Sequence, residues 1–250
     1  MSIFSIFSGK KEALPLPIAT DIHCHILPGV DDGSPDVETS VALVERMQKW
    51  GIRRIIATPH VTECSFENTP DILDPALDEL QTTLRERGNT IEVIRSSENR
   101  IDDYFRELLK AGQIQLMPDD YILIENPFIQ EPWQLDQFIY DLRIKGMRPI
   151  LAHPERYHYY YERNSTRYAE MHRAGTYFQI NILSLAGAYG KIEKKVAEEL
   201  LERGMVDFLG TDLHNERHAD IIDRYLTTSD ARRHFAAMGS VMNDRVFPTL

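Results

Sequence analysis

The sequence has few cysteines and no cluster of basic residues. Only Cys24 and Cys64 occur in 250 residues, which argues against a disulfide framework and favours a reducing cytoplasm. The formal net charge is -11, and Lys and Arg are nowhere dense enough to predict a nucleic-acid-binding surface. A site for an anion would therefore have to provide its own local positive charge.

The chain also lacks a long apolar run. Residues 1–8 are apolar but far fewer than the ~20 that a membrane span needs, and Lys10 and Lys11 follow them, whereas a signal peptide carries its basic residues first. We therefore expect no direct membrane insertion. We expect residues 1–17 to form an N-terminal arm that docks on the surface or contacts a partner, and residues 18–250 to form one domain.

The most informative segment is residues 20–33. An extended chain there places His23 and His25 on one face and Cys24 on the other, and two imidazoles at a strand end are the start of a metal site. The Pro-Gly and Asp-Asp-Gly sequences that follow are typical of turns. They could bring Asp31 or Asp32 back to the same strand end as a third ligand.

Apolar segments of β-branched character alternate with segments of helical periodicity. We predict seven strands, at residues 18–24, 52–58, 90–97, 121–124, 148–152, 176–182 and 206–210. We predict helices at residues 35–51, with Ser34 as N-cap, and at 70–88, 101–112, 133–146, 165–174, 191–203, 219–226 and 229–238. This alternation predicts an α/β fold with a parallel sheet, and the length and regularity favour a barrel over an open sheet.

Metal-binding side chains follow every predicted strand except the sixth. In α/β barrels the functional residues lie at the C-terminal ends of the strands. The residues found there are His23, His25, His60, Glu98, Glu125, His153, Asp212 and His214. One histidine or glutamate at such a position is usually a hydrogen-bonded loop residue, but so many at one end of a sheet predict a metal site. We expect the remaining histidines, His158, His172, His218 and His234, on helices or the surface, with His218 left open.

Five motifs occur in a fixed order. They are residues 21–33, Ala-Thr-Pro-His at 57–60, Leu-Ile-Glu at 123–125, Ala-His-Pro-Glu-Arg-Tyr at 152–157 and Thr-Asp-Leu-His-Asn at 211–215. Together they resemble the polymerase and histidinol phosphatase (PHP) superfamily, and in particular its bacterial protein-tyrosine phosphatases of capsule and exopolysaccharide biosynthesis. The resemblance implies a distorted (β/α)7 barrel with a metal site at the C-terminal ends of the strands.

The resemblance also implies three metal ions and a ligand set for each. The first ion would take His23, His25 and Asp212, the second Glu125 and His153, with Glu98 as a bridge, and the third Asp32, His60 and His214. Asp31 would then be structural. The Ser-Ser-Glu-Asn-Arg sequence around Glu98 is more polar than the pattern of the superfamily.

The number and type of these ligands agree with three ions. Nine side chains at about three per ion leave an open position for water or substrate on each. Four carboxylates against three divalent ions leave about two positive charges, which suits a phosphate dianion. Imidazole and carboxylate without thiolate suit manganese, iron or zinc, and the resemblance favours manganese.

The resemblance implies hydrolysis of phosphotyrosine by a metal-bound hydroxide. Arg156, in the His-Pro-Glu-Arg sequence, would hold the phosphate, and Arg217 is the nearest candidate for a second phosphate-binding arginine. A cysteine-based tyrosine phosphatase is excluded, because that chemistry needs an arginine six residues after the cysteine. Val30 and Pro70 occupy those positions here.

The implied substrate is the tyrosine-rich tail of a membrane-bound bacterial tyrosine kinase that controls polysaccharide export, and the phosphatase would be cytoplasmic. A small-molecule phosphoesterase such as a histidinol-phosphate phosphatase is an alternative, which the shape of loops 62–69 and 126–132 would decide. A non-catalytic barrel scaffold is another, although the ligand set argues against it. The tyrosines at 157 and 159–161 could flank a phosphopeptide or pack against the barrel.

Overall fold

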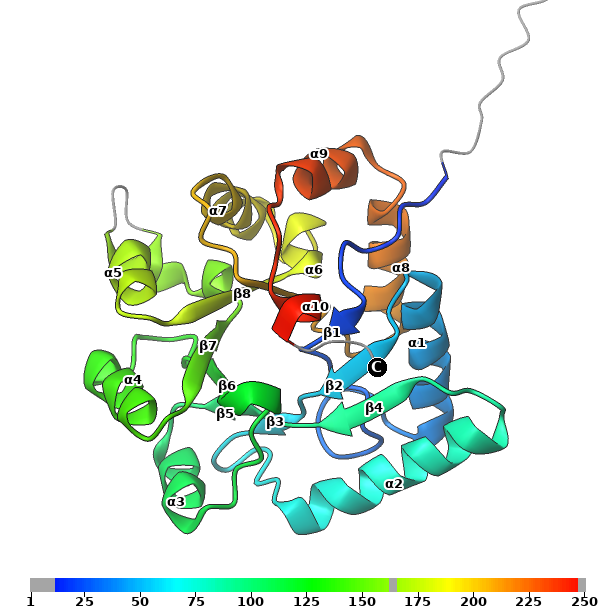
Figure 1. Cartoon of the computed structure of the whole chain (residues 1–250), viewed down its shortest axis with the longest axis horizontal. Coiled ribbons are helices and arrows are strands. Elements are labelled where there is room, and N and C mark those ends of the chain that lie inside the picture. The colour runs from blue at the N-terminus through cyan, green and yellow to red at the C-terminus, as the bar shows by residue number, and fades with distance from the viewer. Residues whose placement is uncertain (1–11, 162–165, 247–250) are drawn as a thin grey trace, which may run out of the picture.

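The computed structural model describes residues 12–161 and 166–246, in which short parallel strands alternate with helices (Figure 1). The strands are β1 (Thr20–Asp21), β2 (Arg54–Ala57), β3 (His60–Val61), β4 (Glu92–Arg95), β5 (Glu98–Arg100), β6 (Tyr121–Glu125), β7 (Arg148–Ala152), β8 (Tyr177–Asn181) and β9 (Phe208–Gly210). The α-helices are α1 (Val37–Lys49), α2 (Pro70–Glu86), α3 (Asp103–Ala111), α4 (Leu135–Ile144), α5 (Arg167–Arg173), α6 (Ile182–Leu185), α7 (Lys191–Glu202), α8 (Glu216–Tyr225), α9 (Ser229–Ala237) and α10 (Asn243–Val246). Single 3-10 turns are η1 (Pro118–Asp120), η2 (Pro154–Arg156) and η3 (His158–Tyr160).

The strands form two parallel sheets, ordered β1-β2-β4 and β3-β5-β6-β7-β8-β9. The predicted strands at residues 52–58 and 90–97 contain β2 and β4. After each of them the chain forms a further short strand in the other sheet, β3 or β5, so the chain is split between the two sheets at both places, and these further strands were not predicted. β2 ends before Pro59, which has no N–H to donate to a sheet ladder. The chain then resumes as β3, where His60 is paired with Glu98 of β5. The split therefore puts two predicted metal ligands on neighbouring strands.

The outer edges of this curled sheet meet at the C-terminal ends of β1 and β9. Cys24 forms an isolated parallel bridge with Leu213. The Asp212 N–H donates to the His23 carbonyl at 2.8 Å, and the His25 N–H donates to the Leu213 carbonyl at 2.9 Å. The helices lie around the outside of the strands (Figure 1). The protein is thus an α/β fold with a curled parallel sheet.

Helix α1 begins two residues later than predicted. Its N-cap is Asp36, whose side chain accepts from the Thr39 N–H at 2.8 Å, and not Ser34. Ser34 instead belongs to the turn after β1, where its N–H donates to the His25 carbonyl at 3.1 Å. This turn passes so close to β1 that a Cβ on Gly33 would lie 2.1 Å from the His25 carbonyl oxygen. Glycine is therefore required where the chain folds back over the histidines.

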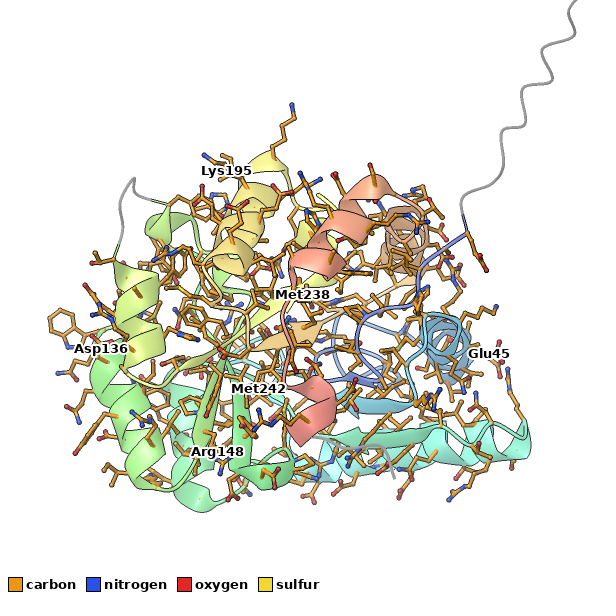
Figure 2. The ribbon with its side chains drawn as sticks, turned by 45° about the horizontal axis from the view of Figure 1, so that its top comes forward. Glu45, Asp136, Arg148, Lys195, Met238 and Met242 are labelled. Atoms are coloured by element: carbon orange, nitrogen blue, oxygen red, sulfur yellow. The ribbon has the colours of Figure 1, made fainter. Side chains whose placement is uncertain are left out.

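The apolar core has two parts. A large cluster lies between the strands and the surrounding helices. A smaller cluster fills the interior of the sheet and consists of Ile22, Ile56, Met117, Tyr121, Leu123, Ile150, Ala152 and Phe208, with Met242 packed against it. Met242 lies on the segment that runs from α9 to α10 (Figure 2). This segment covers the interior cluster at the end of the strands opposite to the metal-ligand candidates.

Residues at both ends of the described chain are tied to the rest of the domain. The Asn243 amide donates to the carbonyls of Thr20 and Leu209 at 2.9 and 2.8 Å, so it joins β1 to β9. The Leu14 N–H donates to the Leu226 carbonyl at 3.0 Å, and the Leu16 N–H donates to the Trp50 carbonyl at 2.8 Å. The described part of the predicted arm thus docks on the domain, while residues 1–11 lie outside the described residues. No helix among the described residues is long and apolar enough to span a membrane.

Candidate metal centre

The nine predicted metal ligands converge at the C-terminal ends of the strands. Seven of them line a cavity of about 470 Å³, namely Asp32, His60, Glu98, Glu125, His153, Asp212 and His214. The other two, His23 and His25, are fully buried beneath it. The Nε2 atoms of His23 and His25 lie 3.3 Å apart, as expected for alternate residues of an extended segment.

A hydrogen bond to the outer ring nitrogen orients each of these two histidines. The Nδ1 atom of His23 lies 2.7 Å from the Gln179 side-chain oxygen, and the Nδ1 atom of His25 lies 2.7 Å from the Asp31 carboxylate. An acceptor at Nδ1 favours the tautomer that leaves Nε2 free to bind a metal. Asp31 orients His25 in this structure, and its assignment as structural, with Asp32 as the ligand, stays a prediction.

Glu98 lies at the centre of the cluster and faces four imidazoles. Its Oε1 atom is 2.9 Å from His153 Nε2 and 3.4 Å from His23 Nε2. Its Oε2 atom is 3.0 Å from His60 Nδ1 and 3.4 Å from His25 Nε2. A carboxylate with both oxygens directed at separate groups of imidazoles has the arrangement of a bridging metal ligand.

Two of these buried atoms approach each other without forming a hydrogen bond. His60 Nδ1 and Glu98 Oε2 are 3.0 Å apart, but both lack a hydrogen-bond partner among the described residues. A buried polar atom without a partner is costly, and a divalent cation shared by both would satisfy them. The donor set of imidazole and carboxylate therefore fits metal ions.

The four groups of mutually close ligand atoms overlap with the predicted assignment. They are His23 with His25 and Asp212, His25 with Asp32, His60 and His214, His23 with Glu98 and His153, and His60 with Glu98 and Glu125. The first group matches the set predicted for one ion, and the second contains the set predicted for another. The remaining predicted set is divided between the last two groups, which share Glu98.

The charges in the cluster shift several pKa values strongly. Burial alone would raise the pKa of Glu98, but the charges of His23 and His60 outweigh it and hold that pKa well below its usual range. Burial and the charge of Glu98 raise the pKa of Glu125 to about 7. Burial and the charge of Arg156 lower the pKa of His153 to about 4. Such opposed shifts among neighbouring buried groups are typical of functional sites.

Asp212 connects the ligand cluster to Arg156, the arginine that was predicted from the His-Pro-Glu-Arg motif. Its Oδ1 atom lies 3.5 Å from His23 Nε2, while its Oδ2 atom accepts from Arg156 at 3.0 Å and from the Tyr189 hydroxyl at 3.0 Å. The Arg156 guanidinium also lies 4.1 Å from the centre of the Tyr189 ring. Both contacts hold this cation at the cavity wall, where an anion would enter.

The backbone is strained at two of the candidate ligands. His153 and Asp212 have φ values of 33° and 51°, a region that residues other than glycine rarely occupy. His153 directly follows β7, and Asp212 lies two residues after the end of β9. Strain of this kind persists where the surroundings fix a functional side chain in place.

A second group of polar side chains links the ligands behind the cavity. The Gln179 amide that receives His23 Nδ1 donates to the Asn181 side chain at 2.8 Å, and the Asn181 amide donates to Asp212 at 2.6 Å. A continuous hydrogen-bonded path therefore runs from His23 to Asp212 through β8. The sixth predicted strand was the one without a metal ligand, and it supplies this support.

Comparison with known proteins identifies the family of this arrangement. Residues 19–223 match the family model described as capsular polysaccharide synthesis, CpsB/CapC. The chain belongs to this family. It is 38% identical to the tyrosine-protein phosphatase YwqE of Bacillus subtilis over 196 residues, which are 78% of this chain and 77% of that protein. It is 30% identical to the tyrosine-protein phosphatase CpsB of Streptococcus agalactiae over 201 residues, which are 78% and 82% of the two chains.

A solved structure of CpsB/CapC relatives has the same fold. It comes from crystal structures of YwqE from Bacillus subtilis and CpsB from Streptococcus pneumoniae, described as unique metal-dependent tyrosine phosphatases. The TM-score is 0.73 at 31% identity, and the match covers 92% of this chain and 99% of that chain. The chain is thus a member of a family of metal-dependent tyrosine phosphatases, and the resemblance predicted from its motifs is confirmed.

The CpsB/CapC chain differs from the prediction in the residues that complete the cavity wall. Arg217 is exposed on α8 and is not among the lining residues, whereas His218 is. Helix α8 begins at Glu216 behind its N-cap Asn215, earlier than the predicted start at residue 219, and this turns Arg217 outward. Lining residues that the prediction did not name include Phe66, Arg100, Phe128 and Tyr189. The unusually polar sequence around Glu98 could have indicated Arg100, but no feature of the sequence indicated the other three residues.

Two tyrosines of the cluster after Arg156 are structural. Tyr157 and Tyr160 are buried, and the Tyr157 hydroxyl donates to the Ala152 carbonyl and accepts from the Asn126 N–H, both at 3.0 Å. These contacts tie the segment after β7 to the segment after β6. The sequence left open whether these tyrosines flank a phosphopeptide or pack against the barrel, and Tyr157 and Tyr160 pack against the domain.

Proposed function

We propose that this chain is a metal-dependent protein-tyrosine phosphatase whose substrate is the tyrosine-rich tail of a bacterial tyrosine kinase that controls polysaccharide export. The observation that carries this proposal is the buried set of imidazoles and carboxylates centred on Glu98, which lies beneath an open cavity with Arg156 at its wall. Membership of the CpsB/CapC family supports the same activity. We place the enzyme in the cytoplasm, where such a tail would be exposed.

The ligand set supports three metal ions, with manganese as the preferred metal and iron or zinc as the alternatives. His23, His25 and Asp212 would hold one ion, Glu125 and His153 the second together with the bridging Glu98, and Asp32, His60 and His214 the third. Ions held there supply an activated water and positive charge that faces the phosphate. We further propose that residues 18–250 form one distorted (β/α)7 barrel, in which the meeting of β1 and β9 closes the sheet.

The side chains of this protein would bind and orient the phosphate. Arg156 already donates to Asp212 with one nitrogen at 3.0 Å, which fixes its guanidinium and leaves other N–H groups to hold phosphate oxygens. Preorganised donors of this kind stabilise the charge that develops on the phosphoryl group. A tyrosine phenolate, with an intrinsic pKa of ~10, leaves without strong protonation, so the site needs no dedicated general acid.

The test is hydrolysis of a phosphotyrosine peptide and of histidinol phosphate by metal-stripped protein with manganese restored. We expect manganese-dependent hydrolysis of the peptide, lost in His23→Ala and Asp212→Ala and retained in Glu45→Gln, whose side chain is exposed on α1 (Figure 2) and does not line the cavity. Hydrolysis of histidinol phosphate alone would replace the proposed substrate with a small molecule. No hydrolysis with any divalent metal would instead support a non-catalytic scaffold.

A further inference from the structure

Two phenylalanine rings line the cavity, and each stacks on a candidate metal ligand. Phe66 follows β3, and its ring lies 5.7 Å from the His60 ring at an interplanar angle of 15°. Phe128 follows β6, and its ring lies 5.9 Å from the His153 ring, also at 15°. The two phenylalanines come from the two loops, 62–69 and 126–132, whose shape the sequence left open.

These rings alternate with two arginines along the edge of the sheet. In the spatial order β3, β5, β6 and β7, the cavity-lining residues at or after the strand ends include, besides the metal-ligand candidates, Phe66, Arg100, Phe128 and Arg156, one for each strand. The guanidinium carbons of Arg100 and Arg156 lie 5.8 and 4.9 Å from the centre of the Phe128 ring. The cavity wall therefore offers apolar, aromatic surface next to cationic groups.

Stacking on a metal-ligand candidate does not require a phenylalanine ring to stay exposed to the cavity. Phe128 remains 38% exposed although it packs against His153, Arg156 and Tyr157. Exposed apolar surface inside an otherwise polar cavity loses contact with water when a ligand with an apolar part enters. A phosphate alone has no such part, but the ring of an aryl phosphate does.

We propose that Phe66 and Phe128 contact the phenol ring of the substrate and select aryl phosphates over alkyl phosphates. The proposal rests on the proposed phosphotyrosine phosphatase function and names the residues that give it specificity for tyrosine. The phosphate would lie against Arg156 and the metal-ligand cluster, and the ring would lie against the phenylalanines. Aromatic rings prefer offset-stacked or edge-to-face contacts at centroid distances of about 4.5 to 7 Å, so either phenylalanine can hold a phenol ring.

The experiment compares the binding of three competitive ligands to manganese-loaded protein. Phenylphosphonate carries an aryl group and cannot be hydrolysed, methylphosphonate carries an alkyl group, and inorganic phosphate carries neither. Inhibition constants against a phosphotyrosine peptide are measured for the wild type, Phe66→Leu and Phe128→Leu. Leucine keeps the wall apolar and removes the ring. The matched control is Ile129→Ala, since Ile129 is adjacent to Phe128, is 92% exposed and does not line the cavity.

We expect the wild type to bind phenylphosphonate more tightly than methylphosphonate. Each phenylalanine variant should bind phenylphosphonate about fivefold more weakly, with less than a twofold change for the other two ligands. Ile129→Ala should bind all three as the wild type does.

Two outcomes would overturn the proposal. Equal weakening for all three ligands would mean that the rings act only by supporting His60 and His153. Unchanged phenylphosphonate binding in both variants would mean that the rings do not contact the aryl group. Failure of the proposed function is recognised separately, because the wild type would then not hydrolyse the phosphotyrosine peptide at all.

Discussion

The two ends of the strands have opposite chemistry although the same strands build both. Towards their N-terminal ends, the side chains that face the interior are apolar, as with Leu123 of β6 and Phe208 of β9. Further along the chain, Glu125 at the end of β6 and Asp212, two residues beyond the end of β9, place carboxylates in the metal-ligand cluster. Because alternate side chains of a strand share a face, Leu123 and Glu125 lie on one face of β6, and the apolar and polar ends belong to one continuous interior.

This difference separates stability from chemistry within one interior. Burying the apolar cluster removes hydrocarbon from water, which stabilises the fold. Burying the carboxylates and imidazoles costs free energy unless they are paired or bind metal ions. The apolar end should therefore determine whether the chain folds, and the polar end should determine what the folded chain does.

The largest effect is expected from a change at the apolar end. Phe208→Ala removes a fully buried ring from the interior cluster and should lower the free energy of unfolding by about 3 to 5 kcal/mol. Urea denaturation measures this loss, with Trp133→Ala as control, since Trp133 is 85% exposed. The turnover number of the folded fraction should stay the same. A large fall in turnover at full folding would contradict the separation of the two ends.

A change at the centre of the polar end should act mainly on metal binding. Glu98→Gln removes the charge that faces four imidazoles, so manganese-dependent activity should fall at least about hundredfold. At manganese concentrations about 100 times the dissociation constant, the wild type should gain about 2.7 kcal/mol of stability, and the variant should lose most of this gain. Calorimetric metal titration and thermal unfolding measure both effects. Glu125→Gln, at the edge of the cluster, should have the smaller effect of the two.

A buried carboxyl next to the site should make stability depend on pH. Burial raises the pKa of Glu155 to about 7, although its carboxylate accepts from the Asn181 N–H at 2.9 Å. The folded state thus holds this proton more tightly than the unfolded state. Its contribution to stability is complete below the unfolded pKa of about 4.5 and is lost as the pH rises to about 7.

Glu155→Gln should remove this part of the pH dependence. The metal-free variant should be more stable than the wild type at pH 7.5 by roughly 2 kcal/mol, and the difference should shrink towards pH 5. Urea denaturation at several pH values provides the comparison. Glu45→Gln is the control, because Glu45 is exposed and labelled on the outer face of α1 in Figure 2. A pH-independent difference between Glu155→Gln and the wild type would rule out this explanation.

The metal-ligand candidates at the polar end of the interior were easier to predict from the sequence than the residues that form the cavity wall. Strand ends are recognisable from turn residues, and parallel strands bring them together, so His23, His153 and Asp212 were placed without knowledge of their contacts. The split of β2 from β3 at Pro59 was not predicted, because it depends on which strands pair across the curled sheet. Phe66 and Phe128 were not predicted, because an aromatic residue in a loop is equally compatible with packing and exposure.

The sequence could have indicated the two residues of β8 that hydrogen-bond to the metal-ligand candidates. Gln179 and Asn181 are buried, alternate polar residues in a strand whose other residues are apolar or aromatic, and buried polar side chains need partners. Arg217 was expected near the phosphate because the resemblance implies a phosphate-binding arginine after His214 and Asn215, and Arg217 is the nearest arginine in the sequence. The N-cap at Asn215 fixed the helical phase differently, so position along the chain was a poor guide to direction there.

The hydrogen bonds of Asn243 affect the order in which the parts of the protein can fold during synthesis. This side chain bonds the carbonyl of Thr20, 223 positions earlier, and the carbonyl of Leu209. Contacts between such distant residues form late, because the intervening chain must first be synthesised and ordered. The nascent chain can therefore build its sheet from β2 to β8 early, while the tie that Asn243 adds between β1 and β9 forms only when α10 has emerged.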